Sequence, residues 1–420
     1  MFLPLLQFSC FLPRKSLNLV NGIVIGKLFN LIIISTFNRL ARNCMKEIKD
    51  IVLAARLAAS ENNAMALATV VKVEGSSYRR PGARMLVTED GQMTGAISGG
   101  CLEGDALKKA LLAIHQRKNR LVSYDTNTEE GSAIGLQLGC NGIVHILFEY
   151  IDLQQADHPI ICLERLLQQR QEALLITYFS IDRQEEQGGT RLLVAGFGEE
   201  IPTVDTHLSE LAEYIKLAKT KQQSVLTSFA EAGKNKEVLI EYLAPTIHLV
   251  VAGAGNDAQP VVETAKLLGW EITVLDGRVS HATAGRFPKA DRVIIGLADE
   301  TIKKISIDPW TVFVLMTHNY RYDLTLLKEL IHTPTSYIGS LGPKTKLLRM
   351  FDDLEQVGIE LSTAQQKIVH GPVGLDIGAE TSDEIAIAVI AEIKAVLSGR
   401  SGGSLKFLAT KIHAENPLIR

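Results

Sequence analysis

The segment that most constrains the fold is an apolar run that leads directly into a glycine turn and then into a helical pattern. The run Leu249–Ala252 precedes a G-x-G-x-x-A motif that begins at Gly253 and ends at Ala258. In such a turn the first glycine permits the tight bend, the second lets a backbone approach a pyrophosphate, and the alanine lets helix and strand pack closely. The start of the helix then offers free N–H groups to an anion. The segment therefore predicts the first unit of a Rossmann-type domain, with Gly253 and Gly255 in its ligand-binding turn.

From His248 toward the C-terminus, strand-like and helix-like stretches alternate. This alternation predicts a parallel sheet with helices on both faces. The predicted strands are His248–Ala252, Glu271–Leu275, Arg292–Ile295, Thr311–Met316 and Ser336–Gly339. Asp276 follows the second strand, roughly 20 residues after the turn, where an acid would meet a ribose hydroxyl. A Rossmann fold whose turn has only a structural role is the alternative interpretation.

Two further motifs lie where predicted strands end, at the edge where open α/β sheets bind ligands. His318 can act as a general acid or base or contact a ligand there, but it can also be a polar loop residue without a role. Lys344 and Lys346 stand in the first turn of the helix that follows Gly339–Pro343. Cations at a helix N-terminus oppose the helix dipole, so their position favours anion capture, with a solvated surface turn as the alternative. A capping-box pattern at Thr381–Glu384 predicts the start of a last helix.

The half of the chain before residue 246 lacks this regular alternation and predicts an α+β domain. Asp90-Gly91 is a hairpin signal, because glycine supplies the positive φ that the turn needs. The predicted helices are Met45–Ala59, one with Leu107 and Ile114 on its apolar face, and Leu163–Gln169. The predicted strands are Ala64–Val73, Ala83–Thr88, Gln92–Ile97, Leu121–Tyr124, Ile143–Glu149, Leu174–Phe179, Thr190–Val194 and Glu237–Leu243.

The residues around one cysteine favour a reactive or metal-binding thiol. Cys101 follows Ser98-Gly99-Gly100 and stands at or just before a predicted helix N-terminus, with Glu103 next in line. The helix dipole favours the thiolate there, and a thiolate can bind a soft metal, attack an electrophile or carry sulfur. The alternative is a small buried hydrophobic residue, the common fate of a free cysteine. Cys140 has a similar glycine loop, whereas Cys162 lies among apolar residues and is predicted to be core.

A loop rich in arginine precedes the Cys101 segment in the sequence. Arg79, Arg80 and Arg84 fall within six residues, just after Ser77. Guanidinium groups bind phosphate or carboxylate through paired hydrogen bonds, so the loop predicts an anion clamp. A solvated surface loop is the alternative.

Length, net charge and cysteine spacing indicate what kinds of protein this chain can be. The chain has 420 residues, which favours two domains, and its formal net charge of −3 gives no reason to expect nucleic acid or a membrane as a partner. None of its five cysteines forms a C-x-x-C pair, so a disulfide framework and a structural zinc site are not expected. This pattern suits a reducing compartment such as the cytoplasm.

The first 44 residues differ from the rest. They contain five basic residues and no acidic one, and Lys27 interrupts their apolar stretch. A lysine at the centre of a membrane helix costs about 2.5–3.5 kcal/mol on insertion scales. We therefore expect residues 1–44 to be a disposable extension or an incorrectly assigned start, with an anchor or targeting segment as alternatives. The domains expected after it are 45–245 (α+β), 246–400 (Rossmann-like) and a tail at 401–420.

Several of these motifs together resemble a known family. The sequences Glu74–Ala83 and Gly95–Glu103 resemble the N-terminal signature of the XdhC/CoxI family. The Gly253 turn, Gly339–Lys346 and His370–Ala379 resemble its C-terminal Rossmann domain. The resemblance runs from about Met45 to about Leu397. The chain departs from it at Gly139-Cys140-Asn141-Gly142, where the family usually has Gly-Cys-Gly-Gly, and in residues 1–44, which have no family counterpart.

The resemblance implies a function. Members of this family are accessory proteins for molybdenum hydroxylases such as xanthine dehydrogenase. They bind the molybdenum cofactor (molybdopterin), support its sulfuration by a cysteine desulfurase and pass it to the apo-enzyme. The implied partners are therefore an apo molybdenum hydroxylase and a cysteine desulfurase, and a homodimer is left open. This favours a cofactor-binding chaperone over a catalyst.

The residues expected to contact the cofactor come from both halves of the chain, and Cys101 is also a candidate molybdenum contact. They are Ser77, Arg79, Arg80, Arg84, Ser98, Gly99, Gly100, Cys101, Glu103, Cys140, Gly253, Gly255, Asp257, Asp276, His318 and Lys344. The rival hypotheses are an NAD(P)-dependent oxidoreductase, which Asp276 favours, and a nucleotide-binding module that uses the Gly253 turn. The paired glycine–cysteine loops favour the chaperone, since hydride transfer needs no thiol.

Overall fold

The computed structural model describes most of the chain after residue 44. The described residues are 45–75, 77–125, 142–155, 157–168, 170–182, 184–196, 208–231 and 234–408. The predictions for residues 1–44 and for Cys140 therefore lie outside the described residues.

The N-terminal half begins with a five-stranded antiparallel sheet in the order β3-β2-β1-β5-β4. Its strands are β1 (Met65–Gly75), β2 (Arg84–Thr88), β3 (Met93–Gly95), β4 (Arg120–Asp125) and β5 (Gly142–Tyr150). The predicted hairpin is confirmed, because β2 and β3 pair across Asp90-Gly91 and Gly91 has a φ of 86°.

Three helices cover this sheet: α2 (Met45–Ser60), α3 (Glu103–Gln116) and α4 (Pro159–Gln168). Alternate residues of a strand face opposite sides of the sheet, so β1 serves two cores. Leu67 packs with α2 and α4, whereas Ala66 and Ala68 pack with α3. Cys162 on α4 is buried as predicted.

A second antiparallel sheet, in the order β7-β6-β9-β8, faces the first. Its strands are β6 (Ala173–Phe179), β7 (Gly189–Ala195), β8 (Val225–Glu231) and β9 (Lys234–Leu243), and α5 (Leu208–Lys221) packs on it. Val71 and Leu147 of the first sheet contact Phe179 and Leu239 of the second in a shared apolar cluster. Neither α5 nor β8 was predicted from the sequence.

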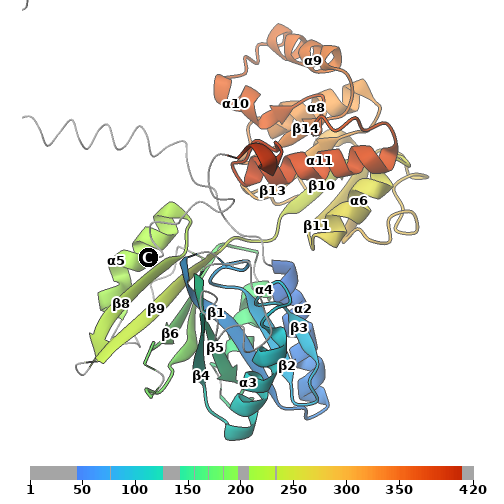
Figure 1. Cartoon of the computed structure of the whole chain (residues 1–420). Coiled ribbons are helices and arrows are strands. Elements are labelled where there is room, and N and C mark those ends of the chain that lie inside the picture. The colour runs from blue at the N-terminus through green and yellow to red at the C-terminus, as the bar shows by residue number, and fades with distance from the viewer. Residues whose placement is uncertain are drawn as a thin grey trace, which may run out of the picture. The chain divides into compact units, whose positions relative to one another are not determined.

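The C-terminal half contains a six-stranded parallel sheet in the order β12-β11-β10-β13-β14-β15 (Figure 1). Its strands are β10 (His248–Ala252), β11 (Glu271–Asp276), β12 (Arg292–Ile295), β13 (Thr311–Leu315), β14 (Ile338–Ser340) and β15 (Val369–His370). Counted from β10, this is the 3-2-1-4-5-6 order of a Rossmann fold. The strand order reverses between β10 and β13. In open α/β sheets, ligands bind in the crevice at the point of such a reversal.

Helices lie on both faces of this parallel sheet, as predicted. α6 (Ala258–Leu267) and α11 (Ser382–Leu397) share one apolar core with β10 and β11. On the other face lie α7 (Ala298–Ile302), α8 (Tyr320–Leu330) and α9 (Lys344–Gln356). The capping box of α11 is confirmed, since the Thr381 side chain accepts the Glu384 N–H and the Glu384 side chain returns to the Thr381 backbone. None of the helices described is long and apolar enough to cross a membrane.

Candidate functional site

The first candidate site is the turn between β3 and α3, which carries Cys101. The Glu103 carboxylate accepts hydrogen bonds from the Ser98 N–H (2.9 Å), the Leu102 N–H (3.1 Å) and the Ser98 hydroxyl. Ser98 Oγ in turn accepts the N–H groups of Gly100 (3.2 Å) and Leu102 (3.1 Å). The two side chains thus fix the backbone on both sides of Cys101, whose thiol is partly exposed.

Glu103 is held in its ionised form by these contacts. Burial alone would raise the pKa of its carboxyl group, but the hydrogen bonds from Ser98 and from the backbone outweigh that effect, and the pKa is lowered. The structure therefore gives Glu103 a role in shaping the turn.

The glycines around Cys101 leave space on one side of the turn. A Cβ on Gly100 or Gly104 would meet no atom within 4 Å, whereas a Cβ on Gly99 would lie 3.3 Å from the Tyr78 ring. Gly100 also has a φ of 106°, which side chains rarely adopt. A ligand could therefore approach the backbone beside Cys101 from the side of Gly100 and Gly104.

The arginine-rich loop lies against this turn. Tyr78 covers Gly99, and Arg79 forms an ion pair with Glu47 of α2 at 2.5 and 2.6 Å. Glu47 also accepts the Ala96 N–H at 3.3 Å. The structure thus brings Arg79, Ser98 and Cys101 into one region, with Glu47 joining the two loops. Ser77 and Arg80 belong to the same loop and are partly exposed.

Arg84 is placed elsewhere. It is 2% exposed and binds Glu241 of the second sheet at 2.5 Å and the Gly82 carbonyl at 2.9 Å. A Cβ on Gly82 would lie 2.5 Å from the Glu241 carboxylate, so this glycine makes room for the pair. The expectation that Arg84 joins the clamp meets a physical obstacle, because its guanidinium group already has a buried carboxylate partner between the sheets.

The thiols of the described residues have different surroundings. Burial raises the pKa of Cys162 to about 11, which makes it an inert core residue.

No group of three or more His, Cys, Asp or Glu side chains among the described residues could hold a metal ion. A metal at Cys101 would therefore need other ligands that arrive with it.

The second candidate site is the edge of the parallel sheet where β10 and β13 end. Gly253 has a φ of 126°, and a Cβ there would lie 2.3 Å from the Met316 carbonyl oxygen. The close approach of the two strand ends thus requires glycine at this position whether or not a ligand binds. His318 follows β13 with a φ of 56°, a conformation that is uncommon outside glycine.

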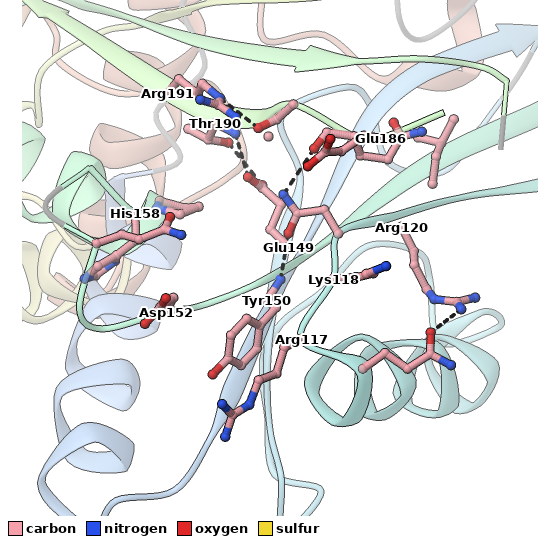
Figure 2. A pocket seen from close by; sticks show the side chains of 18 of the residues that line it. Arg117, Lys118, Arg120, Glu149, Tyr150, Asp152, His158, Glu186, Thr190 and Arg191 are labelled. Carbon is pink, nitrogen blue, oxygen red and sulfur yellow. Dashed lines mark hydrogen bonds between the residues drawn. The ribbon is translucent and has the colours of Figure 1, made fainter. Parts of the chain in front are cut away.

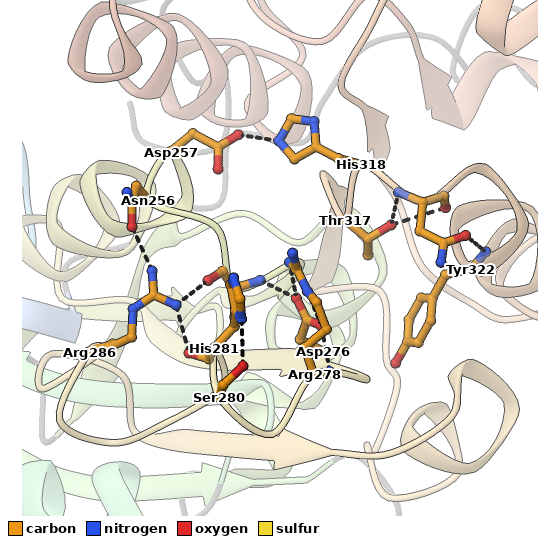
Figure 3. A network of polar contacts seen from close by, with 12 residues as sticks. Asn256, Asp257, Asp276, Arg278, Ser280, His281, Arg286, Thr317, His318 and Tyr322 are labelled. Carbon is orange, nitrogen blue, oxygen red and sulfur yellow. Dashed lines mark hydrogen bonds and ion pairs between the residues drawn. The ribbon is translucent and has the colours of Figure 1, made fainter.

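Asp276 has protein partners for both carboxylate oxygens (Figure 3). One oxygen accepts the Ala254 N–H at 2.7 Å and the Arg278 Nη2 at 2.7 Å, and the other accepts the Arg278 N–H at 2.8 Å and its Nε at 3.0 Å. Burial would raise its pKa, but these bonds lower it. Asp276 therefore ties the end of β11 to the glycine turn, and a ribose hydroxyl would have to displace one of these contacts.

A hydrogen-bond contact joins Asp257 and His318 at this edge of the sheet. Asp257 Oδ2 lies 2.7 Å from His318 Nε2, and Asp257 directly precedes α6 (Figure 3). A Cβ on Gly255 would lie 2.3 Å from Asp257 Oδ1, so this carboxylate is next to the turn. An incoming phosphate would meet a negative charge at the helix start that was expected to receive it.

The two lysines of α9 have different roles. Lys344 is exposed at the first residue of the helix. Lys346 binds the buried Asp323 carboxylate at 2.7 Å and the Leu341 carbonyl at 2.8 Å. The carboxylate that Lys346 binds therefore belongs to the protein, and anion binding by Lys344 stays a prediction.

Several residues that shape these sites were not predicted from the sequence. Glu47 and Tyr78 organise the Cys101 region, and Arg278 and Arg286 organise the edge of the parallel sheet. Arg286 donates to the Ala254 carbonyl at 2.8 Å and to Asn256 Oδ1 at 2.7 Å. Arg278 follows Asp276 closely and could have been found, whereas no local pattern links Glu47 or Arg286 to its partners.

Comparison with known proteins gives two family matches. Residues 58–125 match the XdhC and CoxI family, and residues 249–393 match the XdhC Rossmann domain. These ranges contain the Cys101 turn and the Gly253 turn.

Individual relatives cover most of the chain. The chain is 30% identical over 328 residues to a Bacillus subtilis protein whose name describes it as a probable subunit of xanthine dehydrogenase, and the match covers 78% of this chain and 91% of that protein. It is 24% identical over 332 residues to the Escherichia coli molybdenum cofactor insertion chaperone PaoD, covering 79% of this chain and 82% of PaoD. A crystal structure described as a xanthine dehydrogenase from Bacillus halodurans superposes with a TM-score of 0.64 at 26% identity, covering 84% of this chain and 97% of the other.

Proposed function

Because the chain belongs to the XdhC and CoxI family, we propose that it is an accessory protein that binds the molybdenum cofactor and delivers it to an apo molybdenum hydroxylase. One relative is named a molybdenum cofactor insertion chaperone, and another is named as a probable part of xanthine dehydrogenase. Sulfuration of the bound cofactor by a cysteine desulfurase is part of the proposal.

The observation that carries the proposal is the setting of Cys101. Its turn is fixed by Ser98 and Glu103, and the side next to Gly100 and Gly104 is open. A thiolate is a soft ligand that suits molybdenum or a transferable sulfur. The cofactor brings its own dithiolene ligands, so a single protein thiol is enough.

The Arg79–Glu47 pair suits a reversible contact. The cofactor carries a phosphate, and a phosphate next to Arg79 would compete with the Glu47 carboxylate for the same guanidinium group. A contact that exchanges between an internal acid and the ligand can be formed and released at small net cost. This fits a protein that must give up its cargo.

The oxidoreductase alternative has less support. The acid expected to bind a ribose, Asp276, has both oxygens bound to Ala254 and Arg278, and Asp257 places a negative charge beside the turn. A nucleotide at the Gly253 turn would have to displace these contacts.

The proposal is tested by what the protein carries when it is purified from cells that make the cofactor. We expect the full chain to contain molybdenum and to release a fluorescent pterin on oxidation, and Cys101→Ser to lose most of both. Cys162→Ala is the matched control and should retain them, because Cys162 is buried in the core. Bound nicotinamide nucleotide without molybdenum, or full loading of Cys101→Ser, would contradict the proposal.

A further inference from the structure

The N-terminal half contains a cavity of about 1080 Å³, which none of the sequence motifs indicated (Figure 2). Its walls come from the end of α3, the start of β4, the end of β5, the residues before α4 and the start of β7. A volume near the upper end of the usual range for ligand pockets is enough for a nucleotide-sized molecule.

This cavity is separate from the Cys101 site. Cys101 precedes the first residue of α3, whereas the cavity is lined by Gln116, Arg117 and Lys118 at the other end of that helix. A helix of 14 residues is roughly 20 Å long at 1.5 Å per residue. A ligand at one end of α3 would therefore not contact the other end.

Basic side chains from several elements line the cavity. They are Lys109 on α3, Arg117 and Lys118 just after it, Arg120 on β4 and Arg191 on β7. Cations at a helix C-terminus can be explained by the helix dipole, which accounts for Arg117 and Lys118 alone. Arg120 and Arg191 come from two different sheets, and the dipole does not explain why they line the same cavity.

The acids of the lining do not cancel this charge. Glu185 is paired with Lys234 and Lys236, at 3.4 and 3.2 Å. The lining holds five acids in all, and once the paired Glu185 is set aside, its five bases face Glu149, Asp152, Asp157 and Glu186. A cavity with more bases than unpaired acids favours an anionic ligand.

A buried polar atom in the lining also lacks a partner. His158 is 7% exposed, and no described residue forms a hydrogen bond with its Nδ1. Buried polar groups are nearly always hydrogen-bonded, so an orphaned nitrogen calls for an explanation. Burial lowers the pKa of His158, and the neutral ring keeps one N–H, which can donate a hydrogen bond to a phosphate oxygen or a water when it is on Nδ1.

We propose that this cavity binds a phosphorylated small molecule, through Arg117, Lys118, Arg120 and Arg191. Phosphate groups match the several cations, because guanidinium groups bind them through paired hydrogen bonds and lysines add point charges. The site does not depend on the molybdenum cofactor, and its failure would leave the proposed function intact.

The test uses inorganic pyrophosphate as the probe with the full chain. Lysines are acetylated with a limiting reagent at constant ionic strength, with and without millimolar pyrophosphate, and the sites are mapped by mass spectrometry. Lys109 and Lys118 should be protected several-fold. Lys108 is the internal control, because it is exposed on the same helix and does not line the cavity.

Calorimetry of two variants completes the test. Arg117→Glu combined with Lys118→Glu should weaken pyrophosphate binding at least tenfold, and Lys108→Glu should leave it unchanged. Thermal unfolding checks that each variant is folded. Equal acetylation of Lys109, Lys118 and Lys108, or equal affinity in all variants, would overturn the proposal. Binding confined to the Gly253 turn would appear as heat without protection of Lys118, which also overturns it.

Discussion

At the scale of single residues, the setting of Cys101 depends on Glu103. The sequence shows a cysteine between glycines and a helix, and it predicts that position well. It does not show that Glu103 turns back to accept the Ser98 and Leu102 N–H groups. That contact depends on the path of the backbone, which spacing alone does not determine. The same holds for Glu47, which lies 32 residues before Arg79 in the chain.

We predict that Glu103→Ala destabilises the protein, because two backbone N–H groups and the Ser98 hydroxyl lose a charged acceptor. The expected loss is about 2 kcal/mol in the free energy of unfolding. Glu103→Gln keeps one acceptor oxygen and should lose less. Urea unfolding measures the effect, with Glu213→Ala as the control, since Glu213 is exposed on α5. Similar losses in Glu103→Ala and Glu213→Ala would show that Glu103 does not organise the turn.

At the scale of elements, polar pairs join the two antiparallel sheets of the N-terminal half. Arg84 on β2 binds Glu241 on β9, and Glu149 on β5 binds Thr190 on β7. Alternation along the strands predicts which residues face inward but not that these polar residues meet across the sheets. Arg84 was predicted as a ligand contact because nothing near it in the sequence indicates that its partner is a carboxylate 157 residues away.

Glu149 gives this junction a pH dependence. Burial raises its pKa from 4.5 to about 7, although the bonds from Thr190 oppose the shift. The pKa of Glu149 is therefore higher in the folded protein than in the unfolded one. Glu149 contributes its full stabilisation below about pH 4.5 and loses it as the pH rises through about 7. We predict that Glu149→Gln removes this loss, so the stability difference between the native chain and the variant should change by on the order of 3 kcal/mol across that window.

Urea unfolding of both proteins at several pH values between 5 and 8 measures this difference. Glu213→Gln is the matched control and should follow the native curve, because its carboxyl group is exposed. Parallel curves for the native chain and Glu149→Gln would mean that Glu149 ionises in the folded protein as it does in the unfolded one.

At the scale of the whole molecule, the sequence predicted the fold class because most strands are apolar runs bounded by turns. The five strands expected in the Rossmann sheet are present, with ends shifted by a few residues. β15 was missed because two residues are too short for a periodic signal, and only pairing with β14 defines it. α5 was missed although its buried residues Leu211, Ile215 and Ala218 have the i, i+4, i+7 spacing of one helix face, because the residues between them are mostly polar or charged.

Protection of Cys101 from alkylation shows whether the molybdenum cofactor binds at its turn. The full chain, with and without cofactor, is treated with limiting iodoacetamide, and the modified cysteines are mapped by mass spectrometry. We expect Cys101 to react in the cofactor-free protein and to be protected in the loaded one, while Cys162 stays unmodified in both. Equal modification of Cys101 in the loaded and cofactor-free proteins would mean that the cofactor does not bind at this turn.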